Sequence, residues 1–219
     1  MEAERLRRGV LRGMSARYRL FRWSMVAIGR LLFGFTVHGA EKVPKEGALI
    51  VAANHRRYAD PVLVSMAVPR RIQWMAKKEL FGFPFERFFF FIGAFPVDRE
   101  SGRAALRTAL NLLKAGWALG IFPEGQRRRK GYDSEHAPKS GVAMLAARGG
   151  APVIPVYVSR IPGLLERLRG GKLHVYIGDP ITFNNTEKKR GGRAYEGFAC
   201  ELLRMIYGLG GEERRGGPS

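Results

Sequence analysis

The chain alternates between two patterns of apolar and polar positions from residue 36 onward. Short, largely apolar runs that are typical of strands are separated by stretches in which apolar residues recur at the three- or four-residue spacing of a helix. This alternation predicts an α/β fold with a mostly parallel sheet flanked by helices. The predicted strands are Thr36–Gly39, Ala48–Ala53, Ile72–Met75, Ala94–Val97, Leu119–Phe122, Val153–Val158 and Leu173–Ile177. The predicted helices are Pro61–Ala67, Phe85–Phe91, Arg103–Gly116, Gly141–Arg148 and Arg193–Tyr207.

The run Ala48–Ala53 is apolar throughout, which is typical of a parallel strand covered on both faces. In sheets of this kind, ligand sites gather at the carboxyl ends of the strands. Polar residues that directly follow predicted strands are therefore the candidates for chemistry. We place the α/β domain at residues 36–208 and expect a flexible, glycine-rich tail at 209–219.

Residues 1–35 are predicted to form a separate helical segment. Its apolar residues recur at helical spacing, and eight arginines lie in its first thirty residues. Arginines on one side, with Phe21 and Trp23 on the other, predict a basic amphipathic helix in a membrane interface. A basic helix packed on its own domain fits the pattern equally well. A spanning helix is disfavoured, because it needs about 20 predominantly apolar residues and Arg22 and Arg30 interrupt the best stretch.

Composition narrows the classes of protein and partner. Hydrophobic residues make up 46% of the chain, which supplies a core and excludes wholesale disorder. The 38 Lys and Arg against 19 Asp and Glu give a net charge of +19, so an anionic partner is expected: polyphosphate, nucleic acid or anionic lipid. The single cysteine, Cys200, excludes a disulfide framework and a cysteine-clustered zinc site. The histidines are too scattered in the sequence to predict a metal site.

The first polar cluster, NHRRYADP, directly follows the strand Ala48–Ala53. Its His55 and Asp60 are five positions apart, so the carboxylate can accept a hydrogen bond from the imidazole. Such a bond fixes the tautomer and leaves the other ring nitrogen as a base. Asp60-Pro61 is also a common start of a helix, with the aspartate as N-cap, so a structural role fits as well.

Two further clusters follow other predicted strands. Arg99 follows Ala94–Val97 and precedes a helix, where it can bind a phosphate, although a solvated loop arginine fits too. Glu124 and Gly125 follow Leu119–Phe122 and precede a run of cations that begins at Arg127. A carboxylate beside cations can hold a substrate that carries both hydroxyl and phosphate groups. An internal counter-ion and a solvated basic loop are the alternatives.

In chain order these residues form the motifs NHxxxxD, G-x-F-x-x-D-R and FPEG-x-R, followed by K-x-G at Lys139 and a V-I-P-V strand. The combination resembles the 1-acylglycerol-3-phosphate acyltransferases, the lysophosphatidic acid acyltransferases of the glycerolipid acyltransferase superfamily. The resemblance covers roughly Val37 to Ile181. It implies that His55 is the general base that deprotonates a lysophospholipid hydroxyl and that Asp60 orients the imidazole ring.

The resemblance also implies the rest of the reaction. The hydroxyl attacks an acyl thioester directly, and with 1-acylglycerol 3-phosphate as acceptor the product is phosphatidic acid. Arg99 and Arg127 are implied to bind the substrate phosphate, and Glu124 and Gly125 to line the glycerol-phosphate pocket. We also expect Lys139 to contact the substrate. No cofactor or metal is implied beyond the thioester, which can be acyl-CoA or an acyl carrier protein derivative.

The third motif departs from the family pattern. Gln126 stands where Thr or Ser is usual, and Arg128 replaces a small hydroxyl residue. The head group of the acceptor therefore stays open: glycerol 3-phosphate, another lysophospholipid or a lyso-aminolipid are alternatives. A different alternative for the function is a non-catalytic basic protein that binds lipid or nucleic acid. No specific nucleic-acid module is recognisable in the sequence, however. We expect a peripheral protein on the anionic, cytoplasmic face of a membrane.

Overall fold

The computed structural model describes residues 15–82, 84, 86–97, 102–127, 137–184 and 192–211. Their strands form one seven-stranded sheet in the order β1-β7-β6-β2-β5-β3-β4, parallel throughout except between β6 and β7. The predicted α/β class is therefore confirmed. The strands are β1 (Thr36–His38), β2 (Leu49–Ala53), β3 (Ile72–Lys77), β4 (Ala94–Val97), β5 (Ala118–Ile121), β6 (Val153–Val158) and β7 (His174–Ile177). The α-helices are α2 (Ala16–Phe33), α3 (Asp60–Ala67), α4 (Glu86–Phe91), α5 (Gly102–Lys114), α6 (Gly141–Gly149), α7 (Leu164–Leu168) and α8 (Gly192–Leu209).

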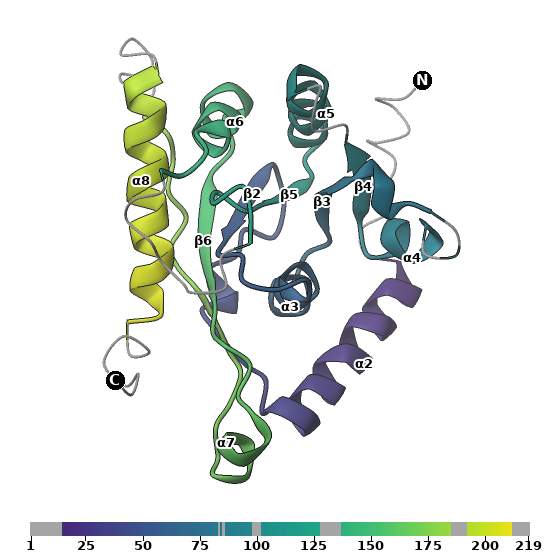
Figure 1. Cartoon of the computed structure of the whole chain (residues 1–219). Coiled ribbons are helices and arrows are strands. Elements are labelled where there is room, and N and C mark those ends of the chain that lie inside the picture. Colours follow the sequence, from purple (N-terminus) through teal and green to yellow (C-terminus); the bar gives the residue numbers. More distant parts are fainter. Residues whose placement is uncertain are drawn as a thin grey trace.

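Strand β2 lies in the middle of the sheet, between β5 and β6, and all of its residues are buried. Side chains alternate across a strand. Leu49 and Val51 therefore pack with α2, α3 and α4, whereas Ile50 and Ala52 pack with α5, α6 and α8. Figure 1 shows these two sets of helices on opposite sides of the sheet. Burial on both faces accounts for the unbroken apolar run of this strand in the sequence.

The predicted strands and helices of the domain all have counterparts whose ends lie within two residues of the predicted ones. Strand β1 stops at His38 because Gly39 takes the left-handed conformation, with φ of +78°. Helix α8 runs to Leu209, one residue into the predicted tail. Helix α7 is an addition that the sequence pattern did not predict. Its leucines are exposed, so no buried face repeats at helical spacing.

Helix α2 represents the described part of the N-terminal segment. It begins after Ser15, whose hydroxyl accepts a hydrogen bond from the Tyr18 N–H at 3.2 Å. One side of the helix packs on α3, and a Cβ at Gly29 would lie 2.9 Å from the Met66 side chain. The other side exposes large apolar residues: Leu20, Trp23, Ile28, Leu31 and Leu32. Residues 1–14 lie outside the described residues, and none of the described helices is long and apolar enough to span a membrane.

Candidate active site

The loop that follows β2 is fixed to the neighbouring strand by a buried asparagine. Asn54 donates its side-chain amide to the Val158 carbonyl at 3.0 Å and accepts the Val158 N–H at 2.7 Å. The side chain thus replaces a backbone partner where the β2 strand ends. This pair of hydrogen bonds sets the position from which the next residue, His55, leaves the sheet. The sequence analysis gave Asn54 no such role, since nothing in the motif distinguishes it from other loop asparagines.

His55 and Asp60 are brought together as the spacing predicted. The His55 Nδ1 atom lies 3.0 Å from Asp60 Oδ2, and the same oxygen accepts the backbone N–H groups of Arg56 at 2.6 Å and Arg57 at 2.7 Å. Asp60 is the first residue of α3, and the N-cap position is taken by Ala59. Asp60 binds the loop that precedes the helix. Since an ionised carboxylate only accepts, Nδ1 donates, and Nε2 carries the lone pair.

An aromatic stack supports the imidazole from one side. The ring of Phe122 lies 4.0 Å from that of His55, at 15°, and the ring of Trp74 lies 5.0 Å beyond it, at 17°. Trp74 is itself held, because its Nε1–H donates to the Ser65 hydroxyl at 2.9 Å. The His55 side chain is 17% exposed and that of Asp60 only 4%. The pair therefore presents one edge of the imidazole to solvent and keeps its carboxylate partner covered.

Glu124 links the first and third motifs from the inside. It is 2% exposed, and its Oε1 accepts the backbone N–H of His55 at 3.0 Å and the hydroxyl of Tyr207 at 2.9 Å. Burial, followed by the nearby Glu124 charge, raises the pKa of Tyr207 above its ordinary value, so the hydroxyl stays a donor. The bond to the His55 backbone lets Glu124 hold the loop that carries His55.

Tyr207 reaches this network from α8 and was not anticipated from the sequence. The helical pattern of α8 predicts which face is buried, but it gives no sign that this hydroxyl has a carboxylate partner 83 residues away. Tyr195 on the same helix carries the same group and packs its ring on Phe183. What distinguishes the two tyrosines is the contact of Tyr207 with Glu124, which depends on the tertiary structure.

Arg127 of the third motif lies at the surface beside the same loop. The Arg127 guanidinium lies 3.5 Å from the centre of the Tyr58 ring, between His55 and Asp60 in sequence. Gly125 has φ of +70°, and a Cβ there would lie 2.8 Å from the Lys139 side chain. The Lys139 N–H in turn donates to the Pro123 carbonyl at 2.7 Å. Of the predicted site residues, Arg99 lies outside the described residues. Arg128, which departs from the family pattern of the third motif, lies outside them too.

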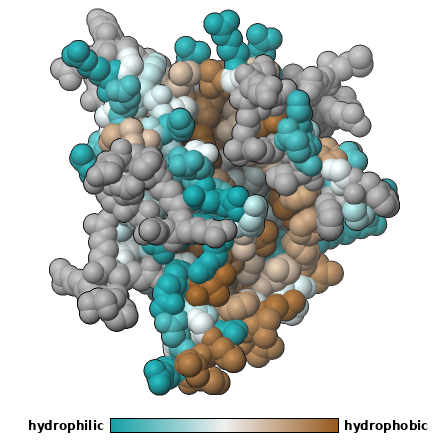
Figure 2. Space-filling model, viewed as in Figure 1, coloured by the Kyte–Doolittle hydropathy of each residue, from teal (hydrophilic) through white to brown (hydrophobic). Residues whose placement is uncertain are grey.

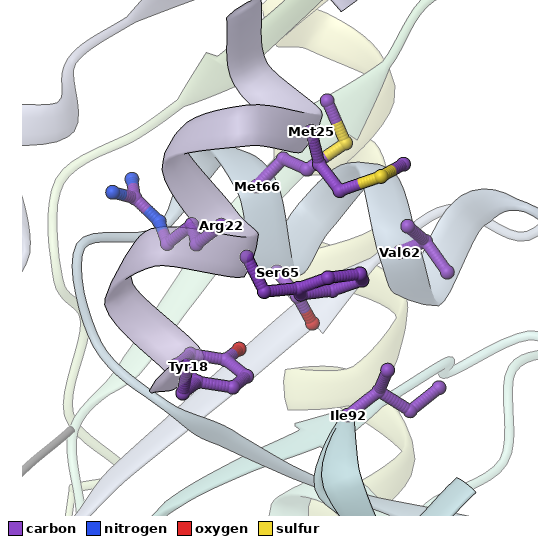
Figure 3. A pocket seen from close by; sticks show the side chains of 8 residues that line it. Tyr18, Arg22, Met25, Val62, Ser65, Met66 and Ile92 are labelled. Carbon is purple, nitrogen blue, oxygen red and sulfur yellow. The ribbon is translucent and has the colours of Figure 1, made fainter. Parts of the chain in front are cut away.

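A small apolar pocket lies away from these residues, between α2 and α3. Figure 3 shows Met25 of α2 and Val62 and Met66 of α3 around it. Its lining also includes Ser65, whose hydroxyl accepts the indole N–H of Trp74, the tryptophan that stacks on Phe122. None of the predicted site residues lines it. The pocket thus belongs to the contact between α2 and the core.

A family model described as Acyltransferase matches residues 34–159. That stretch is more than half of the chain, and it contains both the His55–Asp60 pair and the buried Glu124. The chain belongs to the acyltransferase family. Its Lys139 and the V-I-P-V strand fall within the match, whereas Tyr207 lies beyond it.

Two curated relatives and one solved structure show how far the similarity extends. The chain is 35% identical over 152 residues to the 1-acyl-sn-glycerol-3-phosphate acyltransferase of Bacillus subtilis, which covers 68% of this chain and 74% of that protein. It is 32% identical to the Streptococcus pneumoniae protein of the same name, over 69% of this chain and 57% of that protein. The family and these relatives together make the chain an O-acyltransferase.

The crystal structure of the 1-acyl-sn-glycerophosphate acyltransferase PlsC from Thermotoga maritima has a similar fold. The two superpose with a TM-score of 0.64 at 24% sequence identity, over 94% of this chain and 86% of that chain. At this level of identity the likeness bears on the fold.

The Tyr207 hydroxyl should matter to acyl transfer by this enzyme. Tyr207→Phe removes one hydrogen bond to a buried carboxylate, worth about 1.5–3 kcal/mol, and loosens the Glu124 contact that holds the His55 backbone. We expect kcat to fall about tenfold, the acceptor KM to change little, and the protein to lose stability. Tyr195→Phe, on the same helix, is the control. Equal kcat in both variants would show that the Glu124–Tyr207 bond does not position His55.

Proposed function

We propose that this acyltransferase transfers a fatty acyl group from a thioester to the free hydroxyl of 1-acylglycerol 3-phosphate, which yields phosphatidic acid. The names of the curated relatives support the reaction in general terms. The single observation that carries the mechanism is the 3.0 Å contact between His55 Nδ1 and Asp60 Oδ2. It leaves Nε2, on the partly exposed edge of the ring, as a base.

The proposed reaction forms one bond, breaks one bond and transfers one proton twice. His55 Nε2 takes the proton of the acceptor hydroxyl as the oxygen attacks the thioester carbonyl carbon. The carbon–sulfur bond of the tetrahedral intermediate then breaks, and the imidazolium returns the proton to the departing thiolate. Asp60 stabilises the imidazolium while it exists, because its carboxylate accepts the Nδ1–H throughout. No nucleophilic side chain and no acyl-enzyme are required.

The acceptor phosphate is proposed to bind the basic residues beside His55. Arg127 lies against Tyr58 of the catalytic loop, and Lys139 packs on Gly125, so both cations are near the loop that carries the base. Arg99 is proposed as a third phosphate ligand on the strength of its motif. Guanidinium groups suit phosphate because they can donate two parallel hydrogen bonds.

The donor is proposed to be acyl-CoA or an acyl carrier protein thioester, with no other cofactor. Both donors present anionic groups, which suit a chain of net charge +19. Because the acceptor is a membrane lipid, the enzyme is proposed to work at the anionic, cytoplasmic membrane surface.

Acyl transfer from a defined thioester tests the proposal directly. The purified chain is given 1-acylglycerol 3-phosphate, glycerol 3-phosphate, another lysophospholipid or a lyso-aminolipid in mixed micelles, and the products are separated. We expect the highest kcat/KM with 1-acylglycerol 3-phosphate. A higher value with another acceptor would reassign the substrate and direct attention to Gln126, the exposed residue that departs from the motif. No transfer to any of them would contradict the enzyme function itself.

The exposed side of α2 is proposed to be part of the membrane anchor predicted for the N-terminal segment. Deleting the segment is a poor test, because Tyr18 and Gly29 of α2 are buried in the core. Trp23→Ser with Leu31→Ser changes only residues that are 68% and 84% exposed. We expect this variant to bind anionic vesicles about tenfold or more weakly with unchanged thermal unfolding. Unchanged vesicle binding would mean that α2 only packs on its own domain.

A further inference from the structure

Residues 159–173, between β6 and β7, form an excursion with an exposed apolar tip. Its helix α7 carries Leu164, Leu165 and Leu168, which are 65%, 69% and 76% exposed. Figure 1 shows α7 at the far end of the excursion, away from the sheet, and Figure 2 shows apolar surface gathered at that end of the molecule. Three large leucines on one short exposed helix leave an apolar surface that water solvates poorly.

Several backbone groups of this tip are hydrogen-bonded within the excursion itself. The Gly163 N–H donates to the Glu166 carboxylate at 2.7 Å and the Gly171 N–H donates to the Glu166 carbonyl at 2.7 Å. The Arg169 N–H donates to the Leu165 carbonyl at 3.2 Å. These internal bonds lower the cost of moving the tip towards an apolar phase, where an unpaired backbone group is costly.

The charges of the excursion are almost all positive. It contains one acid, Glu166, and four cations: Arg160, Arg167, Arg169 and Lys172. Glu166 forms an ion pair with Arg160. Its hydrogen bond from Arg160 and that from the Gly163 N–H lower the pKa of this carboxyl to about 2. The apolar tip is therefore surrounded by net positive charge, a combination that complements an anionic lipid surface.

The excursion leaves the sheet at the carboxyl ends of the parallel strands, where His55 also lies. Strands β2 and β6 are parallel, with Ala53 paired to Val156, and Asn54 bonds to Val158, the last residue before the excursion. Arg167 also fixes the excursion to the end of α2, where it donates to the Leu32 carbonyl at 3.1 Å. The tip, the exposed end of α2 and the catalytic loop therefore lie on the same side of the molecule.

We propose that the α7 tip is a second membrane contact, in which Leu164, Leu165 and Leu168 enter the bilayer interface and the surrounding arginines and lysine bind anionic head groups. It is distinct from the anchor proposed for α2, and its purpose rests on the proposed function, since a lipid acceptor must reach His55 from the bilayer. Two contacts on one rigid domain fix its orientation, which one helix alone leaves free to rotate.

Vesicle binding without substrate tests this contact. Leu164→Ser, Leu165→Ser and Leu168→Ser are combined, and partition onto 100-nm vesicles of 30% phosphatidylglycerol in phosphatidylcholine is measured by sedimentation. We expect the partition coefficient to fall about 100-fold, because three leucines no longer leave water, with thermal unfolding unchanged since the leucines are exposed. The matched control replaces them by isoleucine, which keeps the apolar surface. Equal partition of the serine and wild-type proteins would overturn the proposal.

A fluorescent probe locates the tip independently. In a Cys200→Ser background, Leu165→Cys and Lys114→Cys are labelled with an environment-sensitive dye. Lys114 is the last residue of α5 and precedes β5, so it lies near the amino ends of the parallel strands, opposite to the carboxyl ends from which the excursion leaves. We expect a blue shift with vesicles only at position 165. A shift at neither position, or at 114 alone, would overturn the contact.

Activity distinguishes this proposal from its foundation. With a short-chain acceptor dissolved in water, the serine variant should keep wild-type kcat/KM. If the wild type is inactive on every acceptor while the vesicle results hold, the proposed function fails and the contact stands. If the serine variant binds vesicles normally but loses activity with acyl carrier protein thioesters alone, the tip is a carrier protein site instead, and the membrane proposal is wrong.

Discussion

Replacing His55 by alanine is expected to lower kcat/KM for acyl transfer by about 10²–10⁴-fold, the usual contribution of a general base. The imidazole supplies a nitrogen that can take up a proton, and the contact of Nδ1 with Asp60 leaves Nε2 for that role. Without it, an acceptor hydroxyl must lose its proton to water as it attacks the thioester. The measurement is thiol release from the thioester under saturating acceptor, with product identity checked by chromatography.

The matched control is His38→Ala. His38 is an exposed histidine on the edge strand β1, and its ring lies 3.2 Å from that of His174. It has the same side chain as His55 but lies outside the loop that carries His55. It should retain wild-type activity. Circular dichroism and thermal unfolding check that His55→Ala stays folded after losing its contact with Phe122. Activity within about threefold of wild type in folded His55→Ala would remove His55 from the proton transfer.

Asp60→Asn is expected to have the second-largest effect, on both catalysis and stability. The Oδ2 atom of Asp60 accepts three hydrogen bonds, one from the His55 ring and two from the backbone N–H groups of Arg56 and Arg57. An amide carries no charge to strengthen these bonds, and its NH₂ can face the donors. We expect kcat to fall about 10²-fold or more, because neither the ring tautomer nor the imidazolium is stabilised. The free energy of unfolding should fall by about 2–3 kcal/mol, the cost of weakened bonds to a charged group.

Asp179→Asn provides the comparison for this variant. Asp179 pairs with Lys42 at 2.9 Å, but its side chain is 77% exposed, so the same chemical change should leave stability within about 0.5 kcal/mol. The measurements are kcat, acceptor KM and urea unfolding of both variants. If Asp60→Asn lost stability while kcat stayed normal, Asp60 would be a structural residue of the loop and not a partner of the base.

Glu124 illustrates how the two motifs act as one unit. The sequence gave this residue a place at the glycerol-phosphate pocket or, alternatively, the role of an internal counter-ion. The described contacts of its Oε1 are internal, to the His55 backbone and to Tyr207. A substrate contact stays a prediction. The observed bonds mean that a substitution here would displace the base as well, so lost activity in a Glu124 variant cannot by itself be assigned to substrate binding.

The strength of the sequence lay in features that are local or periodic. The apolar run of β2 indicated a strand buried on both faces, because a parallel sheet covered by helices leaves no polar side. The five-residue interval from His55 to Asp60 was enough to predict their contact, since one loop joins them. The carboxyl ends of parallel strands meet at one edge of a sheet, so the sequence alone indicated that the first and third motifs lie together.

What the sequence could not determine were contacts between residues distant along the chain, where no period or spacing carries the information. The sequence contains two tyrosines on α8, and only the packing of that helix on β6 brings Tyr207 rather than Tyr195 to Glu124. Asn54 finds Val158 only because β2 and β6 are neighbours. Likewise, the leucines of α7 read as an ordinary loop, and it is the reversal from β6 to antiparallel β7 that carries them outward. Side-chain identity fixed the local chemistry of the site, and the order of strands in the sheet decided which distant groups support it.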